Sequence, residues 1–167
     1  VVHGLFWTSL RARFQTSALR VTAHCVCVAR PVPGEDRADV LPRLLCEHVS
    51  GEFDDVDALN PSVVHTSTGY YNFYSGYDGK TWHTGLAISP DGIEWQKQGR
   101  IMSPDPATWE GDYIAANGSV VDMDGEFWHW YQAGRVPRIG LARSKDGVQW
   151  TKERTPVLPL GPRGSWD

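Results

Sequence analysis

Two segments of this chain carry the same pattern of residues, about 57 positions apart. The matched positions comprise a β-branched run, an aromatic run and a turn motif. They align as 62–64 with 119–121, 70–74 with 127–131, and the Ser-x-Asp-Gly-x-x-Trp motif at 89–95 with that at 144–150. The turn motif recurs after 55 residues, so one loop differs in length by two residues. A repeat of this length favours folds in which similar units pack against each other.

Each unit predicts four short strands joined by tight turns. The Asp-Gly pair of the turn motif lies between two strand-like runs, where glycine supplies the positive φ that a hairpin needs. The second strand of each unit has large aromatic residues at consecutive positions, so both of its faces are expected to be buried. The expected strands are 61–65, 70–76, 84–89 and 93–97, then 118–122, 127–133, 139–144 and 148–152.

Four antiparallel strands with both faces covered by neighbouring units are typical of a β-propeller blade. A further marker, an aromatic residue followed by an acid, recurs at Phe53-Asp54, Trp109-Glu110 and Trp166-Asp167. We therefore expect an all-β chain in which residues 44–167 form a partial propeller. It contains two complete blades, at about 53–108 and 109–165, and the start of a third. Residues 1–43 show no blade pattern and are left as a linker or an extra strand.

The composition argues against several classes of protein. Residues 44–167 carry ten basic and seventeen acidic side chains, a balance that argues against nucleic-acid binding. No run approaches the roughly 18 apolar residues of a membrane-spanning helix. Cys25, Cys27 and Cys46 form no CxxC pair, so neither a disulfide framework nor a zinc site is expected. Residues 15–29 match a secretory signal poorly, so the sequence assigns no compartment.

The two units resemble blades of a known group of enzymes. The runs NPSVV…YYNFYSG…TGLAISPDGIEWQKQGRI and NGSVV…FWHWYQAG…IGLARSKDGVQWTKERTPVL are similar to blades of the five-bladed β-propeller glycosidases, glycoside hydrolase families 43, 32, 68 and 130. The resemblance covers residues 44–167 and implies a funnel-shaped active site at one end of the propeller axis. A sialidase-type propeller is a weaker alternative, because the turns here lack one residue of the sialidase motif.

The resemblance also implies carboxylates at the innermost strands, the first of them directly before a proline. That position is Asn60 here, and the matching one in the next unit is Asn117. An amide cannot act as nucleophile or general base, so we expect these two residues to bind sugar hydroxyls instead. Asp57 and Asp112, a few residues upstream, are the candidate catalytic acids, and both are expected in loops that could reach the mouth of the funnel. Trp82, expected in the loop between the second and third strands, is a candidate for stacking on a sugar ring.

The expected function is therefore that of a glycoside hydrolase-like propeller acting on or binding oligosaccharides of the arabinose, xylose, fructose or mannose type. A non-catalytic carbohydrate-binding or scaffolding propeller is the alternative. His65, His83 and His129 lack metal-ligand spacing, so neither a metal site nor a cofactor is expected, with a structural cation on the axis left open. Because two blades leave apolar faces uncovered, this chain is expected to be part of a longer protein or to associate.

Overall fold

The computed structural model describes residues 51–165. The expectations for residues 1–43, for the three cysteines and for the marker at 166–167 lie outside these residues. Between residues 51 and 165 the chain forms eight strands, and it has no helix there that could cross a membrane. The strands are β1 Asp57–Thr66, β2 Gly69–Tyr77, β3 Trp82–Ser89, β4 Gln96–Met102, β5 Ala115–Met123, β6 Glu126–Ala133, β7 Arg138–Ser144 and β8 Thr151–Lys152.

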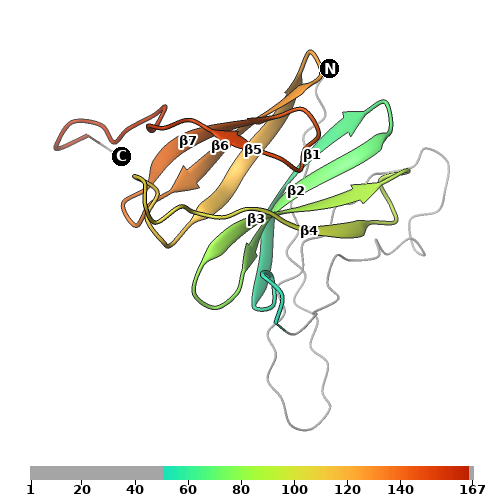
Figure 1. Ribbon diagram of the computed structural model, residues 1–167, viewed down its shortest axis with the longest axis horizontal. Helices are drawn as coiled ribbons and strands as arrows, with labels where there is room; N and C mark the ends of the chain where they lie inside the picture. Colours follow the sequence, from blue (N-terminus) through green and yellow to red (C-terminus); the bar gives the residue numbers. More distant parts are fainter. Residues whose placement is uncertain (1–50, 166–167) are drawn as a thin grey trace, which may run out of the picture.

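These strands form two four-stranded antiparallel sheets, in the orders β1-β2-β3-β4 and β5-β6-β7-β8 (Figure 1). Every neighbour in a sheet is also the next strand in sequence, so each sheet is a simple succession of hairpins. The aromatic strands β2 and β6 lie inside their sheets, with β1 and β5 on one side of them. The prediction of an all-β chain with four strands in each unit is confirmed.

The fourth strand of each sheet begins three residues later than the sequence predicts, at Gln96 and Thr151. The turn motif occupies the intervening residues. In the first sheet, the carboxylate of Asp91 accepts the N–H groups of Ile93 and Glu94 at 2.8 and 3.0 Å. These two N–H groups are therefore used inside the turn and are not available to a strand.

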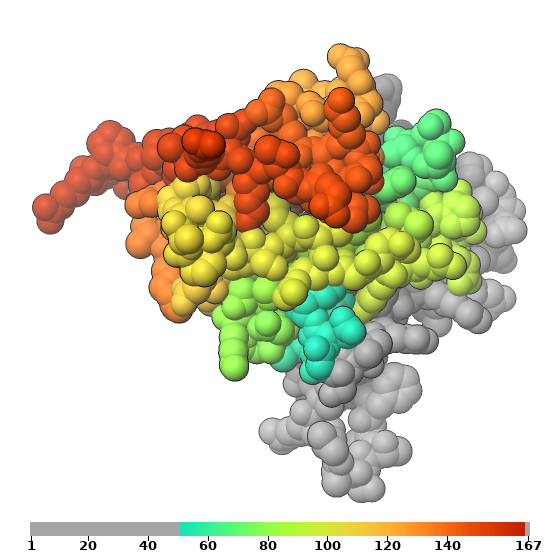
Figure 2. All heavy atoms as spheres, viewed as in Figure 1, coloured from blue at the N-terminus to red at the C-terminus, as the bar shows by residue number. Residues whose placement is uncertain are grey.

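The two sheets pack face to face through their aromatic side chains. Phe73 and Leu86 of the first sheet share one core cluster with Val120 and Phe127 of the second. The sheets are also joined by hydrogen bonds, because the hydroxyl oxygen of Ser62 in β1 accepts the N–H of Val120 in β5 at 2.9 Å. The space-filling view shows the sheets in continuous contact, with the segment after β8 extending away from them (Figure 2).

The two aromatic strands differ in how far they are covered. In β2, the consecutive Phe73 and Tyr74 are each only 2% exposed, so both faces are buried as expected. In β6, burial alternates: His129 is buried, whereas Trp128 and Trp130 on the other face are half-buried. The expectation of two buried faces is wrong for β6 within residues 51–165, because no third sheet is present there to cover the tryptophans.

Candidate functional site

The two sequence-predicted amides occupy corresponding places in the first strands of the two sheets, β1 and β5. The register of β1 against β2 shifts between Leu59 and Ser62, and that of β5 against β6 shifts between Ala116 and Ser119. Each shift is an irregularity of the bulge type, and each contains one of the amides. Asn60 has φ 50° and Asn117 has φ 52°, in the left-handed region that, among residues other than glycine, is adopted mostly by Asn, Asp and His.

These bulges bring the two amides together. Nδ2 of Asn60 donates to Oδ1 of Asn117 at 2.7 Å, and Nδ2 of Asn117 donates to Oε1 of Gln132 at 3.3 Å. The backbone N–H of Asn117 donates to the hydroxyl oxygen of Ser75 at 2.9 Å. Asn117 is therefore held at both its side chain and its backbone, by residues from both sheets.

Ser75 and Gln132 were missed by the sequence reasoning, although a signal for them exists. Ser75 in β2 and Gln132 in β6 are 57 residues apart, the spacing that also separates Asn60 from Asn117. Comparing polar residues at all aligned positions, and not only before the innermost strands, identifies both.

This network is uncharged and can both donate and accept hydrogen bonds. Asn60 and Asn117 are exposed, whereas Ser75 is 1% exposed and accepts the backbone N–H of Asn117. Amide side chains offer an acceptor oxygen and two donor hydrogens, which matches the mixed character of a sugar hydroxyl. No member of the network can exchange a proton near neutral pH, so the network is suited to binding and not to acid–base chemistry.

Asp57 does not lie in a loop as expected, because β1 extends to it and makes it the first residue of the strand. It is half-buried, it pairs with Tyr77 in the register, and its Oδ1 accepts the N–H of Ala58 at 3.0 Å. The carboxylate lies in the same strand as Asn60, three residues earlier. It is therefore at the end of the sheet where β1 begins.

Asp112 lies in the turn before β5, as the sequence predicts, and is exposed. Its Oδ1 is 3.3 Å from a guanidinium nitrogen of Arg135, and Arg135 also lies over the ring of Tyr113, 5.4 Å from its centroid. The backbone oxygen of Asp112 accepts the hydroxyl of Thr81 at 3.2 Å. This contact places the turn against the β2–β3 loop of the first sheet.

Trp82 is the first residue of β3 and not part of a loop, which corrects the sequence expectation. The ring of Trp82 stacks on Tyr77 with centroids 4.7 Å apart, and the backbone N–H of Trp82 donates to the backbone oxygen of Tyr113 at 2.9 Å. The strand begins earlier than expected because Trp82 and His83 continue the ladder with β2, opposite Tyr77 and Gly76. One ring face of Trp82 is already used by Tyr77.

A hydrogen-bonded chain of a serine, a histidine and an aspartate lies near Trp82. Nδ1 of His83 is 3.0 Å from the hydroxyl of Ser103, and its Nε2 is 3.2 Å from a carboxylate oxygen of Asp78. Burial lowers the pKa of His83, against the opposing effect of Asp78. The imidazole is therefore neutral at pH 7, and it links the β2–β3 loop to the segment after β4.

The other histidines form no metal centre in the described part of the chain. His65 lies against Tyr70, with ring centroids 4.5 Å apart, and His129 is buried beside Tyr131 and Trp150. Burial, with a smaller effect of Lys152, lowers the pKa of His129 to about 3. Residues 51–165 contain no group of three or more His, Cys, Asp or Glu side chains placed to hold a metal ion.

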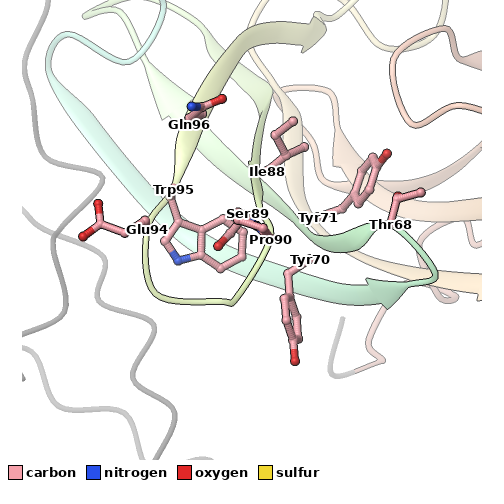
Figure 3. A pocket seen from close by; sticks show the side chains of 9 residues that line it. All are labelled: Thr68, Tyr70, Tyr71, Ile88, Ser89, Pro90, Glu94, Trp95 and Gln96. Atoms are coloured by element: carbon pink, nitrogen blue, oxygen red, sulfur yellow. The ribbon is translucent and has the colours of Figure 1, made fainter.

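A cavity of about 460 Å³ lies in the first sheet near the β1–β2 and β3–β4 connections (Figure 3). Tyr70, Glu94, Trp95 and Gln96 are among the side chains that line it. It contains none of the sequence-predicted site residues.

The fold resembles that of solved glycoside hydrolases. Superposition on a family 117 glycoside hydrolase of Zobellia galactanivorans gives a TM-score of 0.58 at 20% identity over 66% of this chain. A protein of Parabacteroides distasonis described as a glycoside hydrolase gives 0.51 at 25% identity over 57% of the chain. A sucrose-6-phosphate hydrolase of Lactobacillus gasseri gives 0.53 at 20% identity over 62%. The chain resembles the propeller-type glycoside hydrolases. The resemblance inferred from the two repeated units is thereby confirmed.

This chain spans only part of those proteins. The matched region is 41% of the Zobellia enzyme, 31% of the Parabacteroides protein and 24% of the Lactobacillus enzyme. No protein-family profile matches the sequence, and no curated relative is found at significant similarity. At sequence identities of 20–25%, the structural likeness establishes the architecture of the two sheets.

Proposed function

We propose that this chain forms two neighbouring blades of a five-bladed, glycoside hydrolase-like propeller and binds an oligosaccharide at the end where β1 and β5 begin. The observation that carries the proposal is the 2.7 Å hydrogen bond between Asn60 and Asn117, which joins corresponding residues of two innermost strands. The glycoside hydrolases among the structural neighbours support a carbohydrate ligand. Arabinose, xylose, fructose and mannose oligosaccharides are the candidates.

The strained backbone at the two amides supports the same site. The left-handed region costs most residues other than glycine about 1–2 kcal/mol and costs asparagine less, so an asparagine persists there with support from its neighbours. Ser75 holds the Asn117 backbone in this conformation through its hydroxyl. Strain of this kind is concentrated at functional sites, and here it occurs at the two residues that meet between the sheets.

Titration calorimetry with arabino-, xylo-, fructo- and manno-oligosaccharides tests the binding. Asn117→Ala is expected to weaken binding at least tenfold, because it removes the amide that contacts both Asn60 and Gln132. Asp124→Ala is the matched control: Asp124 also has a left-handed backbone, at φ 56°, but lies in the β5–β6 turn at the far end of the sheet. Equal affinities for the wild type and Asn117→Ala would show that the amides are not the binding site.

Hydrolysis is a second candidate function, carried out by Asp57 and Asp112. The support for it is that all three compared neighbours are hydrolases and that both carboxylates lie where β1 and β5 begin. Glycoside hydrolysis requires two carboxyl groups that flank the scissile bond. Asp57→Asn and Asp112→Asn should each abolish release of reducing sugar while leaving oligosaccharide affinity within threefold. Unchanged turnover in either variant excludes that residue as a catalytic group.

A further inference from the structure

The two amides at the bulges differ in the residue that follows each of them. Asn60 precedes Pro61, and Asn117 precedes Gly118. Proline has no backbone N–H, whereas glycine has an N–H with no side chain beside it to obstruct an approach. Asn72, the third asparagine of the chain, is fully buried. Asn117 is therefore the one asparagine that is both exposed and followed by an unobstructed backbone nitrogen.

The packing of the second sheet requires the glycine at position 118. A Cβ there would overlap Nε2 of His129 and the backbone oxygen of Trp130. Asn117 and Gly118 also lie where the register of β5 against β6 shifts, so neither of them has a partner in that register. The accessible nitrogen beside the Asn117 side chain is thus a consequence of packing, and it lies outside the regular ladder.

The side-chain carbonyl of Asn117 has a hydrogen-bond donor already in place. Nδ2 of Asn60 donates to Oδ1 of Asn117 at 2.7 Å. When a nucleophile adds to Cγ of Asn117, negative charge develops on Oδ1, and a donor positioned at that oxygen stabilises the transition state. Nδ2 of Asn117, the nitrogen that would leave, makes the longer hydrogen bond to Gln132, at 3.3 Å. The shorter contact is therefore at the atom that gains charge.

We propose that Asn117 undergoes self-deamidation through a succinimide, and that Asn60 promotes this reaction by stabilising the oxyanion. The backbone nitrogen of Gly118 bonds to Cγ of Asn117, the bond from Cγ to Nδ2 breaks, and ammonia leaves with the proton of the Gly118 N–H. The reacting groups belong to adjacent residues, so the ring closure is intramolecular. Water then opens the ring at either carbonyl, which gives aspartate or isoaspartate at position 117.

The product changes the character of the amide network. A carboxylate at position 117 still accepts from Nδ2 of Asn60, but it cannot donate to Oε1 of Gln132. The network, which is uncharged before the reaction, gains a negative charge. Any effect of this charge on oligosaccharide affinity rests on the proposed function, whereas the modification itself does not.

Incubation of the folded full chain at about pH 8 and 37 °C, followed by peptide mass spectrometry, tests the proposal. In the wild type, position 117 is expected to gain the mass of deamidation, while Asn60 and Asn72 stay intact. Asn60→Gly and Asn60→Asp each place a residue that tolerates positive φ and remove the donor, so the reaction should slow about tenfold or more. Asp124→Ala, in the β5–β6 turn, is the control and should react at the wild-type rate.

Urea separates the effect of the fold from that of the local sequence. The hydrogen bond from Asn60 is absent in the unfolded chain, so the wild type and Asn60→Gly should deamidate at equal rates there. The near-UV circular dichroism spectrum establishes that each variant is folded without urea. If Asn60→Gly does not fold, Asn60→Asp replaces it in both comparisons.

Three results would overturn the proposal. The first is a folded wild type in which position 117 stays unmodified. The second is a wild-type rate in either folded variant of Asn60, because the donor would then play no part. The third is a difference between the wild type and the Asn60 variant that persists in urea, because the effect would then belong to the sequence and not to the contact between the two amides.

Discussion

The ammonium group of Lys152 in β8 lies 2.6 Å from a carboxylate oxygen of Glu110, a side chain that is 2% exposed. The hydroxyl of Tyr131 donates to the other carboxylate oxygen of Glu110. The first sheet has the same arrangement, in which Asp54 accepts the Tyr74 hydroxyl at 2.9 Å and the Lys97 ammonium at 2.6 Å. In each sheet a buried carboxylate thus connects the segment before the first strand to the second and fourth strands.

Lys152→Met is expected to destabilise the protein by about 3–5 kcal/mol, because it leaves the carboxylate of Glu110 buried without its counter-charge. The double variant Lys152→Met/Glu110→Gln should recover part of this loss, since a neutral amide costs less to bury than an unpaired charge. Urea unfolding followed by tryptophan fluorescence measures both free energies of unfolding.

Lys145→Met is the control for this prediction. Lys145 is exposed in the β7–β8 turn, so its substitution should change the free energy of unfolding by less than about 0.5 kcal/mol. If Lys152→Met were as mild as Lys145→Met, the buried ion pair would not be a stabilising connection between the strands.

The sequence predicts the order of strands well because the hydrophobic pattern and the turns act locally. The Asp-Gly turns are correctly placed, since Gly92 and Gly147 adopt φ 78° and 76°. Strand ends were less predictable, because β3 begins at Trp82, whose pairing with Tyr77 and backbone hydrogen bond to Tyr113 both lie outside the local pattern. A periodicity argument contains no information about such a partner.

The candidate site was predictable in part for the same reason. Alignment of the two units identifies Asn60 and Asn117. Their mutual hydrogen bond depends on the left-handed backbone at the two bulges, and the local sequence does not predict that conformation. Asp57 was expected in a loop, because it lies a few residues before the run 61–65 that the sequence predicts as a strand. Its position in β1 follows from its pairing with Tyr77.

His129 makes stability depend on pH. Its pKa is lowered to about 3 in the folded protein, chiefly by burial, against about 6.5 in the unfolded chain. Below pH 6.5 the unfolded chain binds a proton at His129 that the folded protein does not bind. The contribution of His129 to the stability of the fold is therefore lost as the pH falls. Between pH 7 and pH 5 the loss amounts to about 2 kcal/mol.

His129→Asn should remove this contribution. Asparagine is the residue at the corresponding position of the first sheet, where Asn72 is fully buried although its amide has no hydrogen-bond partner among the described residues, so we expect the variant to fold with a cost that is the same at pH 7 and pH 5. Urea unfolding at pH 7 and pH 5 should show a drop in the free energy of unfolding that is about 2 kcal/mol larger in the wild type than in the variant. Equal drops would mean that His129 does not resist protonation in the folded state.

Ser75→Ala should affect both stability and binding. The hydroxyl of Ser75 accepts the N–H of Asn117, and its loss leaves that donor without this acceptor, at a cost of about 1–3 kcal/mol. Oligosaccharide affinity should fall as well, since Asn117 loses its backbone support. Ser67→Ala, at an exposed position in the β1–β2 turn, should change neither quantity in thermal melts and calorimetry. Unchanged stability in Ser75→Ala would show that this hydrogen bond does not hold the bulge.

Asn117→Gly separates stability from binding at the amide pair. Glycine adopts positive φ freely, so the variant is expected to be as stable as the wild type or up to about 1 kcal/mol more stable, despite losing two exposed hydrogen bonds. Its oligosaccharide affinity should nevertheless fall, because the amide is gone. Asp124→Gly, at φ 56° in the distant turn, should share the gain in stability and keep the affinity. Urea unfolding measures the stability of both variants, and calorimetry measures their oligosaccharide affinity. If Asn117→Gly binds oligosaccharide as tightly as the wild type, the left-handed backbone at this position serves the fold and not binding.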